Sequence, residues 1–303
     1  MILFPQDSMK SDLMRLWRAC FGDSDEIIRF FFDHRYAPDH CLCYIDETVR
    51  RPVAMLHLLS AGVSEDGGLS SAQYLYAACT REDYRRKGIM ASLIETARRL
   101  GRSRNIKYTL TVPAEPRLFR YYSKQGFYRG YQVRMVYMDR ADLRYLCRNR
   151  IVVPGTPRDT MMKLSEVCEF RRHMLVDREG YVNWDLPAFR YAVGSHEQEG
   201  GHVVTLTYQG DSGYAFCQPE GDTVRVTEFI VRDYFASALL RRILQSYPKA
   251  QRFIFRLPVC DSFFEKYGEV LDFAMISRND GKNPVSVTTL EGSRAPYLGL
   301  PLD

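Results

Sequence analysis

The sequence has no long apolar run, no export signal and little excess charge. No stretch approaches the ~20 consecutive apolar residues that a membrane-spanning helix needs. The N-terminal stretch MILFPQDSMKSDLMRLW has neither a charged leader nor a long apolar segment, so we expect no secretory signal. These absences predict a cytoplasmic protein that does not act in a membrane.

Charge and cysteine usage exclude further classes. The 42 basic and 37 acidic residues give a net charge of +5, which suits an anionic ligand but is too mild to indicate nucleic acid. Among the eight cysteines, Cys41 and Cys43 stand close together, but no second pair completes a metal site, and the six histidines show no metal-ligand spacing. We expect reduced, mostly buried thiols and no bound metal.

The composition that is present is that of an ordinary globular protein. The 303 residues, 46% apolar and 26% charged, suggest about two domains. The first part reads as helix, helix, three strands, helix, strand, helix and strand, which is typical of a mixed α/β layer; one of these helices is expected at 25–34, after a cap at Ser24 or Asp23. Charged, Pro- and Gly-bearing composition marks a junction. We predict a first domain at 1–140, a linker at 141–160, and a second domain with a C-terminal tail at 161–303.

The second half repeats part of the first. The strands QYLYAACT and VRVTEFIV both run into a charged residue and Asp-Tyr, at Asp83 and Asp233, and a helix follows each. Next come the proline-ended strands YTLTVP and FIFRLP, then the expected short helices FRYYSKQGF and SFFEKYGEV. The second copy is shorter before its proline, and it has Phe264 where the first copy has Tyr122. We expect two related lobes, the second without the polar parts; chance similarity of two βαβ units is the alternative.

The turn RRKG, residues 85–88, stands between a strand and an amphipathic helix. A helix N-terminus presents unpaired N–H groups and about half a positive charge, so it attracts phosphate. Gly88 has no Cβ and lets a ligand approach the backbone closely. The turn matches neither the G-x-x-x-x-G-K-[ST] pattern of a triphosphate loop nor the G-x-G-x-x-G pattern of a dinucleotide site. A solvated basic helix cap is the structural alternative.

With its flanking elements, this turn resembles the acetyl-CoA-binding core of the GNAT superfamily of N-acetyltransferases. Arg85 and Gly88 match the family signature [Q/R]-x-x-G-x-[G/A] at the start of a helix, while Met90 departs from the usual Gly or Ala. Tyr122 matches the tyrosine that stands four residues before a Gly-Phe pair. The resemblance covers residues 1–140. The tandem arrangement is similar to the Eis-like branch, although we expect no room for the sterol-carrier-like C-terminal domain of that branch.

The resemblance implies an α/β fold (mixed α+β) of two tandem GNAT-like lobes, each a mixed central sheet flanked by helices, the second degenerate. It further implies that the first lobe binds acetyl-CoA. The end of the strand would pair with the pantetheine arm, the turn would hold the pyrophosphate through its backbone, and the Met90 side chain would point away. The implied cofactor-binding residues are Ala78, Cys79, Thr80, Arg85, Arg86, Lys87, Gly88, Ile89 and Met90.

The implied chemistry is direct attack of a primary amine on the thioester in a ternary complex. Tyr122 is the implied catalytic acid, because a phenol of reference pKa about 10 can return a proton to the departing thiolate, whereas Phe264 cannot. In Eis-like enzymes the terminal carboxylate reaches the active site, so Asp303 is the second catalytic candidate. A core tyrosine and a loosely ordered tail are the alternatives. The general base stays open among residues nearby in sequence: Tyr74, Tyr76, Glu82 and Glu115.

Several alternatives remain open at this point. We expect the acceptor to be a small-molecule or peptide amine, with no nucleic-acid or membrane partner, and a homo-oligomer is compatible with the sequence. A non-catalytic acyl-CoA-binding or regulatory module with the same fold is the main alternative. A nucleic-acid-binding protein would show affinity that falls steeply with salt. Aminoacyl transfer to a cell-wall precursor would not need the intact basic turn.

Overall fold

The computed structural model describes residues 1–148 and 161–299, and the chain forms two compact units. The first unit consists of Met1–Gly130 and Ala274–Thr288, and the rest of the described chain forms the second. Each unit is a mixed sheet flanked by helices, so the predicted α/β class is confirmed. Within the described residues, no helix is long and apolar enough to cross a membrane.

The sheet of the first unit is mixed, with a single parallel pair in the described ladder. Its order is β1-β2-β3-β4-β5-β12, in which β4 and β5 are parallel and the other neighbours antiparallel. Consecutive antiparallel strands need short turns, whereas a parallel pair needs a crossover helix. The strands are β1 (Ile2–Leu3), β2 (Cys41–Asp46), β3 (Arg51–Glu65), β4 (Gly68–Thr80), β5 (Tyr108–Thr111) and β12 (Glu269–Arg278).

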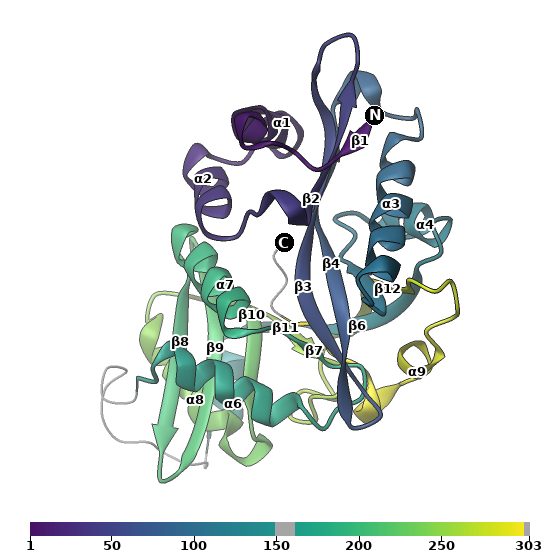
Figure 1. The fold of residues 1–303 in the computed structure, drawn as a ribbon. Coiled ribbons are helices and arrows are strands. Elements are labelled where there is room, and N and C mark those ends of the chain that lie inside the picture. Colours follow the sequence, from purple (N-terminus) through teal and green to yellow (C-terminus); the bar gives the residue numbers. More distant parts are fainter. Residues whose placement is uncertain (149–160, 300–303) are drawn as a thin grey trace. The chain divides into compact units, whose positions relative to one another are not determined.

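Helices cover both faces of this sheet. α1 (Lys10–Phe21) and α2 (Asp25–His34) lie on one side of β2 to β4, and α3 (Ile89–Ser103) and α4 (Pro116–Ser123) lie on the other (Figure 1). The predicted cap of α2 is confirmed, since the Ser24 side chain accepts from Ile27 N. The crossover helix α3 is amphipathic as predicted. Its buried side packs on the sheet through Leu93, Ile94 and Ala97.

The second unit repeats this plan. Its sheet order is β6-β11-β10-β9-β8, with β10 and β11 parallel and the other neighbours antiparallel. The crossover helix α8 and the short α5 pack on one face, and rings of α7 pack against β9 on the other. The elements are β6 (Tyr128–Asp139), α5 (Arg140–Leu146), α6 (Leu164–Leu175), β7 (Val182–Asn183), α7 (Leu186–Gln198), β8 (His202–Tyr208), β9 (Asp211–Glu220), β10 (Thr223–Val231), α8 (Asp233–Ser246) and β11 (Arg252–Pro258).

Two strands cross from one half of the sequence to the sheet of the other. β6 leaves the first unit at Gly130, and its later residues pair with β11; β12 starts in the second unit, and its Met275–Arg278 stretch pairs with β5. Residues 274–288, assigned to the second domain from the sequence, therefore pack in the first unit, where α9 (Val285–Thr288) also lies. The expected linker at 141–160 begins instead inside helix α5, and its residues 149–160 lie outside the described part.

One expected helix is absent from the described second unit. Residues 262–268 of SFFEKYGEV form turns before β12, and not the helix that the first-half counterpart forms as α4. Asp261 Oδ1 accepts a hydrogen bond from Phe264 N at 3.1 Å, which satisfies locally a backbone group that a helix would otherwise use. Such side-chain-to-backbone bonds favour turns over helices. The prediction of a helix was wrong because it rested on the parallel with FRYYSKQGF and did not take this competition into account.

A buried charged network holds the last described residues in the second unit. Arg171 Nε donates to Glu228 Oε1 at 3.0 Å, and the two side chains are 2% and 1% exposed. Three tyrosine hydroxyls complete the network: Tyr181 at 2.6 Å from Arg171 Nη1, and Tyr214 and Tyr297 at 3.0 and 3.2 Å from Glu228. The tail that carries Tyr297 is also bonded through Val182 N to Tyr297 O, and through Trp184 Nε1 to Leu298 O and Gly299 O.

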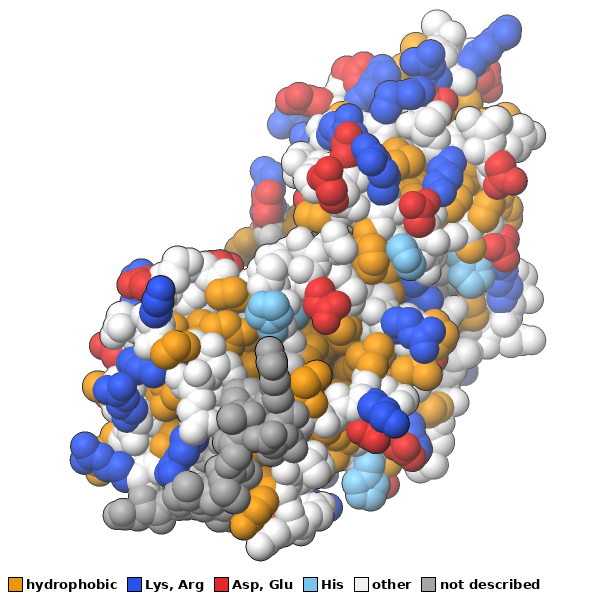
Figure 2. Space-filling view, turned by 90° about the vertical axis from the view of Figure 1, so that its left-hand side faces the viewer, with side chains coloured by type: hydrophobic (Ala, Val, Ile, Leu, Met, Phe, Trp, Pro, Cys, Tyr) orange, Lys and Arg blue, Asp and Glu red, His pale blue; other side chains and the backbone are white. Residues whose placement is uncertain are grey.

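Surface charges of the two signs are largely interspersed. Figure 2 shows Lys and Arg side chains among Asp and Glu side chains over the upper part of one face. Exposed ion pairs occur in both units, such as Lys10–Asp33 in the first and Arg225–Glu220 in the second. Pairs of this kind contribute about 0–1 kcal/mol each, so they shape the surface field more than the stability.

Candidate active site

Strands β4 and β5 separate in the middle of the first sheet. Their parallel ladder runs from Ala72↔Tyr108 to Leu75↔Thr111, while β4 continues to Thr80 paired with β3 alone among the described strands. A β-bulge lies just beyond the separation, with a register shift between Met55 and His57 of β3. Bulges bend a strand and increase its twist, which here turns the end of β4 away from β5.

The bulge carries a strained residue. Ala77 has φ +48°, in the left-handed region that a non-glycine residue rarely adopts. Ala78, Cys79 and Thr80 follow it and pair with β3 on one side, at Cys79↔Met55 and Thr80↔Ala54. Their other edge faces the separation from β5. An extended chain could add to this edge by main-chain hydrogen bonds, as peptides do at open sheet edges.

The basic turn begins where this strand edge ends. Arg85 Nε donates to Thr80 O at 3.1 Å and so ties the turn to β4. Lys87 Nζ lies 4.7 Å from the ring centre of Tyr84, whereas the exposed Arg86 side chain has no recorded partner in the described chain. The three basic side chains therefore have different surroundings: Arg85 is anchored, Lys87 is packed over a ring, and Arg86 is open to solvent.

The backbone of the turn is shaped to expose the start of α3. Arg86 and Gly88 have φ +64° and +77°, and Gly88 is the N-cap, with no side chain capping the helix. The first turn of α3 also contains no acidic residue. Its N–H groups and the positive end of the helix dipole are thus left for an external anion.

The glycine keeps space open in front of the helix. A Cβ built at Gly88 would meet no heavy atom within 4 Å, so the position faces free space and not packed protein. Ile89 is buried in the core, and the Met90 side chain packs against the same core cluster. The large residue at the last signature position therefore leaves the turn unobstructed.

Tyr122 lies where β4 and β5 separate. Its side chain is buried in α4, and its hydroxyl is hydrogen-bonded to the side chain of Thr111, the last residue of β5. Burial raises its pKa above the ordinary value, against the opposing effect of the Thr111 bond. The phenol stays protonated at neutral pH and can act as a proton donor.

The Gly-Phe pair after Tyr122 has a structural reason. Gly126 has φ +80°, and it lets the chain reverse so that Phe127 N bonds back to Tyr122 O at 3.1 Å. The Phe127 ring then packs 5.5 Å from the Tyr122 ring at a steep angle. A Cβ at Gly126 would also approach the Arg98 guanidinium at 3.3 Å. The motif thus fixes the orientation of the tyrosine ring.

The candidate general bases are not brought to Tyr122 as one group. Glu115 is exposed at the N-cap of α4 and pairs with Arg117, while Glu82 is exposed in the short 3-10 helix η3 (Glu82–Tyr84). Tyr74 is buried and stacks on Tyr76 with 6.2 Å between ring centres. Asp303 lies outside the described residues.

Sequence reasoning missed an aromatic cluster beneath α1 and α2. His57 of β3 is buried at 1% exposure, and burial lowers its pKa to about 3, so it remains neutral. Its Nε2 has no hydrogen-bond partner among the described residues. The surrounding rings are those of Trp17, Phe31, Phe32 and Tyr36. The pairing of His57 with Tyr76 across β3 and β4 depends on strand register, which the sequence does not display.

A second missed feature is a thiol pair at the edge of the same strand. The Cys20 side chain of α1 is hydrogen-bonded to that of Cys79 in β4, and Arg85 lies near enough to act on it. The Cys79 bond, then the charge of Arg85, lower the pKa of Cys20 to about 7 despite the opposing effect of burial. Cys20 is half-buried, whereas Cys79 is buried.

The equivalent region of the second unit is filled. The parallel ladder of β10 and β11 also stops early, at Val226↔Phe255, next to a register shift in β10. Here Phe264 is fully buried, and the centre of its ring lies 5.2 Å from that of Phe255 and 5.9 Å from that of Phe229. Aromatic rings thus occupy the place where the first unit has a polar tyrosine.

The crossover helix of the second unit has no open anion site at its start. α8 begins at Asp233, whose own carboxylate lies in the first turn and accepts a hydrogen bond from Ser262 Oγ. An acidic side chain at this position satisfies the helix dipole and repels a phosphate. Across the described residues of both units, no group of three or more His, Cys, Asp or Glu side chains could hold a metal ion.

Comparison with known proteins gives a family match for the first part of the chain. Residues 4–130 match the family model described as acetyltransferase (GNAT) domain. No curated protein matches the chain significantly.

Solved structures share the fold at low sequence identity. A GCN5-related N-acetyltransferase from Kribbella flavida is 15% identical with a TM-score of 0.68, covering 91% of this chain and 70% of its own. A GCN5-related N-acetyltransferase from Anabaena variabilis is 12% identical with a TM-score of 0.70, at 91% and 72% coverage. Eis1 from Mycobacterium abscessus is 9% identical with a TM-score of 0.67, at 92% and 74% coverage.

Proposed function

Since residues 4–130 match the family model of a GNAT acetyltransferase domain, we propose that the protein transfers an acetyl group from acetyl-CoA to a primary amine. One observation carries the proposal: an exposed, glycine-capped basic turn stands at the end of a split strand pair, with a protonated tyrosine at the split. These are the parts needed to hold a phosphate, align an extended arm and protonate a leaving thiolate. The acceptor amine is unidentified.

Acetyl-CoA binding would use main-chain groups of the protein more than side chains. The free edge of Ala78–Thr80 would pair with the amide-containing pantetheine arm, and the N–H groups from Arg86 to Met90 would hold the pyrophosphate. Open space in front of Gly88 fits this role, because a Cβ there would point where the phosphate must approach. Arg86 and the helix dipole would supply the remaining positive charge.

The proposed reaction depends on the alignment of the amine with the thioester and on one proton donated to the leaving thiolate. An amine nitrogen attacks the thioester carbonyl, and holding both reactants in one site removes much of the entropic barrier. Backbone N–H groups of β4 near the bulge would stabilise the oxyanion. The carbon–sulfur bond then breaks, and the Tyr122 hydroxyl gives its proton to the thiolate. The protein residue that takes the amine proton is proposed to be the carboxylate of Asp303.

The second unit is proposed to have no transfer activity of its own. Rings of Phe229, Phe255 and Phe264 fill its strand split, and Asp233 occupies the helix start that would meet a phosphate. Its contribution would be structural.

Calorimetric titration with acetyl-CoA tests the binding part. We expect one site per chain, lost in Gly88→Asp, which puts a negative side chain into the phosphate space. Gly67→Asp is the matched control, because Gly67 also has a positive φ of +73° and open space around a new Cβ. No binding at millimolar acetyl-CoA, or equal loss in both variants, would reject the proposed role of the turn.

Release of free thiol across a panel of amines tests the catalytic part. Tyr122→Phe should lower turnover by roughly 10²-fold while acetyl-CoA binding is kept. Tyr121→Phe is the neighbouring control and should retain activity. Tight binding without thiol release for any amine would favour the alternative, a non-catalytic acyl-CoA-binding or regulatory module.

A further inference from the structure

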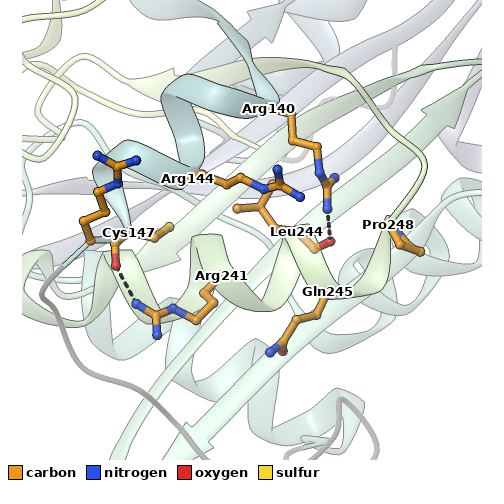
Figure 3. Close-up of a pocket in the computed structure, with 8 residues that line it drawn as sticks. Arg140, Arg144, Cys147, Arg241, Leu244, Gln245 and Pro248 are labelled. Atoms are coloured by element: carbon orange, nitrogen blue, oxygen red, sulfur yellow. Dashed lines mark hydrogen bonds between the residues drawn. The ribbon is translucent and has the colours of Figure 1, made fainter.

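A pocket lined by arginines lies in the second unit, between α5 and the end of α8. Its volume is about 460 Å³, within the usual range for a site that holds a small molecule. Of the described residues that line it, four are arginines and none is acidic. The lining is Arg140, Arg144, Cys147, Arg148, Arg241, Leu244, Gln245 and Pro248 (Figure 3).

Two of the arginines are held rigidly by backbone carbonyls. Arg140 donates to Leu244 O, Tyr247 O and Ala250 O at 2.9–3.0 Å, which caps the end of α8. Arg241 donates to Cys147 O at the end of α5 (Figure 3). Carbonyl groups are neutral, so these bonds fix the two guanidinium groups without cancelling their charge. The entropic cost of ordering these two side chains arises when the protein folds, so it does not reduce the affinity for a ligand.

The other two arginines are exposed, and none of the described acidic residues forms an ion pair with them. Arg144 and Arg148 take part in no ion pair among residues 1–148 and 161–299, and the Arg148 guanidinium lies 5.5 Å from the centre of the Tyr145 ring. The nearby carboxylates of Asp139 and Asp142 line a different depression, together with Arg252.

The positive groups are close enough to disfavour one another. Burial, then the charge of Arg144, lower the pKa of Arg140 below its ordinary value. Figure 3 shows the Arg144 side chain extending toward Arg140 above α8. A multivalent anion would relieve this repulsion, and guanidinium groups bind phosphate oxygens through paired N–H donors.

We propose that this pocket is a binding site for a small phosphate-bearing anion. Arg144 and Arg148 contact the phosphate groups, while Arg140 and Arg241 provide fixed positive charge. The apolar wall of Leu244 and Pro248 faces the organic part of such a ligand. The site is distinct from the basic turn at 85–88 and does not depend on the proposed transferase activity.

Calorimetric titration of the full chain with inorganic pyrophosphate tests the site. The measurement uses Gly88→Asp protein, so that the basic turn does not contribute. Arg144→Gln/Arg148→Gln should weaken binding at least about tenfold, because charge-assisted hydrogen bonds are lost. Arg172→Gln/Arg190→Gln removes the same charge from exposed positions of the second unit outside the pocket, and it should leave binding within about twofold.

Three outcomes would overturn the proposal. One is the absence of pyrophosphate binding at millimolar concentration, and another is equal weakening in the two double variants, which would indicate only a general surface field. Citrate binding as tight as pyrophosphate binding would remove the preference for phosphate. A sugar phosphate that binds more tightly than inorganic phosphate would support a ligand with an organic part. As a control, unchanged melting temperatures would show that the two double variants remain folded.

Discussion

Replacing Arg171 by Met should destabilise the second unit by about 3–5 kcal/mol, because it leaves the Glu228 carboxylate buried without its cation. The pair is nearly inaccessible to solvent, so water cannot replace the lost partner. Burial by itself would lower the pKa of Arg171, but the charge of Glu228, together with the surrounding tyrosines, raises this pKa above its ordinary value.

Hydrogen exchange read by mass spectrometry would measure the loss in the right unit. Peptides covering 182–184 and 295–299 should exchange about 10²-fold faster or more, since Val182 N and Trp184 Nε1 bond to the tail that the network holds. Arg225→Met is the control, because the Arg225–Glu220 pair is 52% and 48% exposed and should matter by less than about 1 kcal/mol.

A double-mutant cycle sharpens the test. Arg171→Met/Glu228→Gln should cost less than the sum of the two single changes, because a neutral glutamine needs no buried cation. The reasoning would be refuted by additive single effects, or by an Arg171→Met protein whose exchange matches that of Arg225→Met.

Three further predictions concern single groups. Gly88→Ala should weaken acetyl-CoA binding without abolishing it, since the backbone strain of an alanine at this positive φ is about 1 kcal/mol and no protein atom lies within 4 Å of the new Cβ. Binding as weak as that of Gly88→Asp, measured by calorimetry, would contradict this. Cys20 should alkylate faster at pH 7 than the buried thiols, because its pKa is lowered to about 7, and Cys79→Ala, which removes the hydrogen-bond donor, should slow it; peptide mass spectrometry measures both rates. Burial raises the pKa of Asp261 to about 6, so the folded state favours the protonated acid. The contribution of this group to stability is full below about pH 4 and is lost as the pH rises through about 6. Asp261→Asn should therefore raise the melting temperature at pH 8 but not at pH 4, and equal shifts at both pH values would count against the assignment.

Local features of the fold could be predicted where one segment carries its own signal. The Ser24 cap and the apolar side of α3 are readable because both involve neighbours within a few turns of helix. The basic turn was identified from its residues and its place before an amphipathic helix, and Tyr122 from the resemblance to the GNAT signature. In the structure the Tyr122 hydroxyl is hydrogen-bonded to Thr111, the last residue of β5.

Features that depend on distant pairing could not be predicted. The exchange of β6 and β12 joins residues far apart in the sequence, and the sequence of neither strand indicates which strand it pairs with. His57 reads as an ordinary strand residue until the register with Tyr76 and the packing of α1 and α2 place it among rings. The turn at 262–268 was misread because one aspartate side chain competes with the helical backbone bonds.

The strand exchange has a consequence for how the chain is made. While the ribosome synthesises the protein from its N-terminus, β5 emerges well before Met275–Arg278 of β12, because β6 to β11 lie between them in the sequence. Until β12 arrives, the sheet of the first unit has an open edge at β5, of the kind that promotes pairing with other chains. The first unit is therefore completed only after most of the second unit has been translated, and a nascent chain stalled before β12 would depend on chaperones to stay soluble.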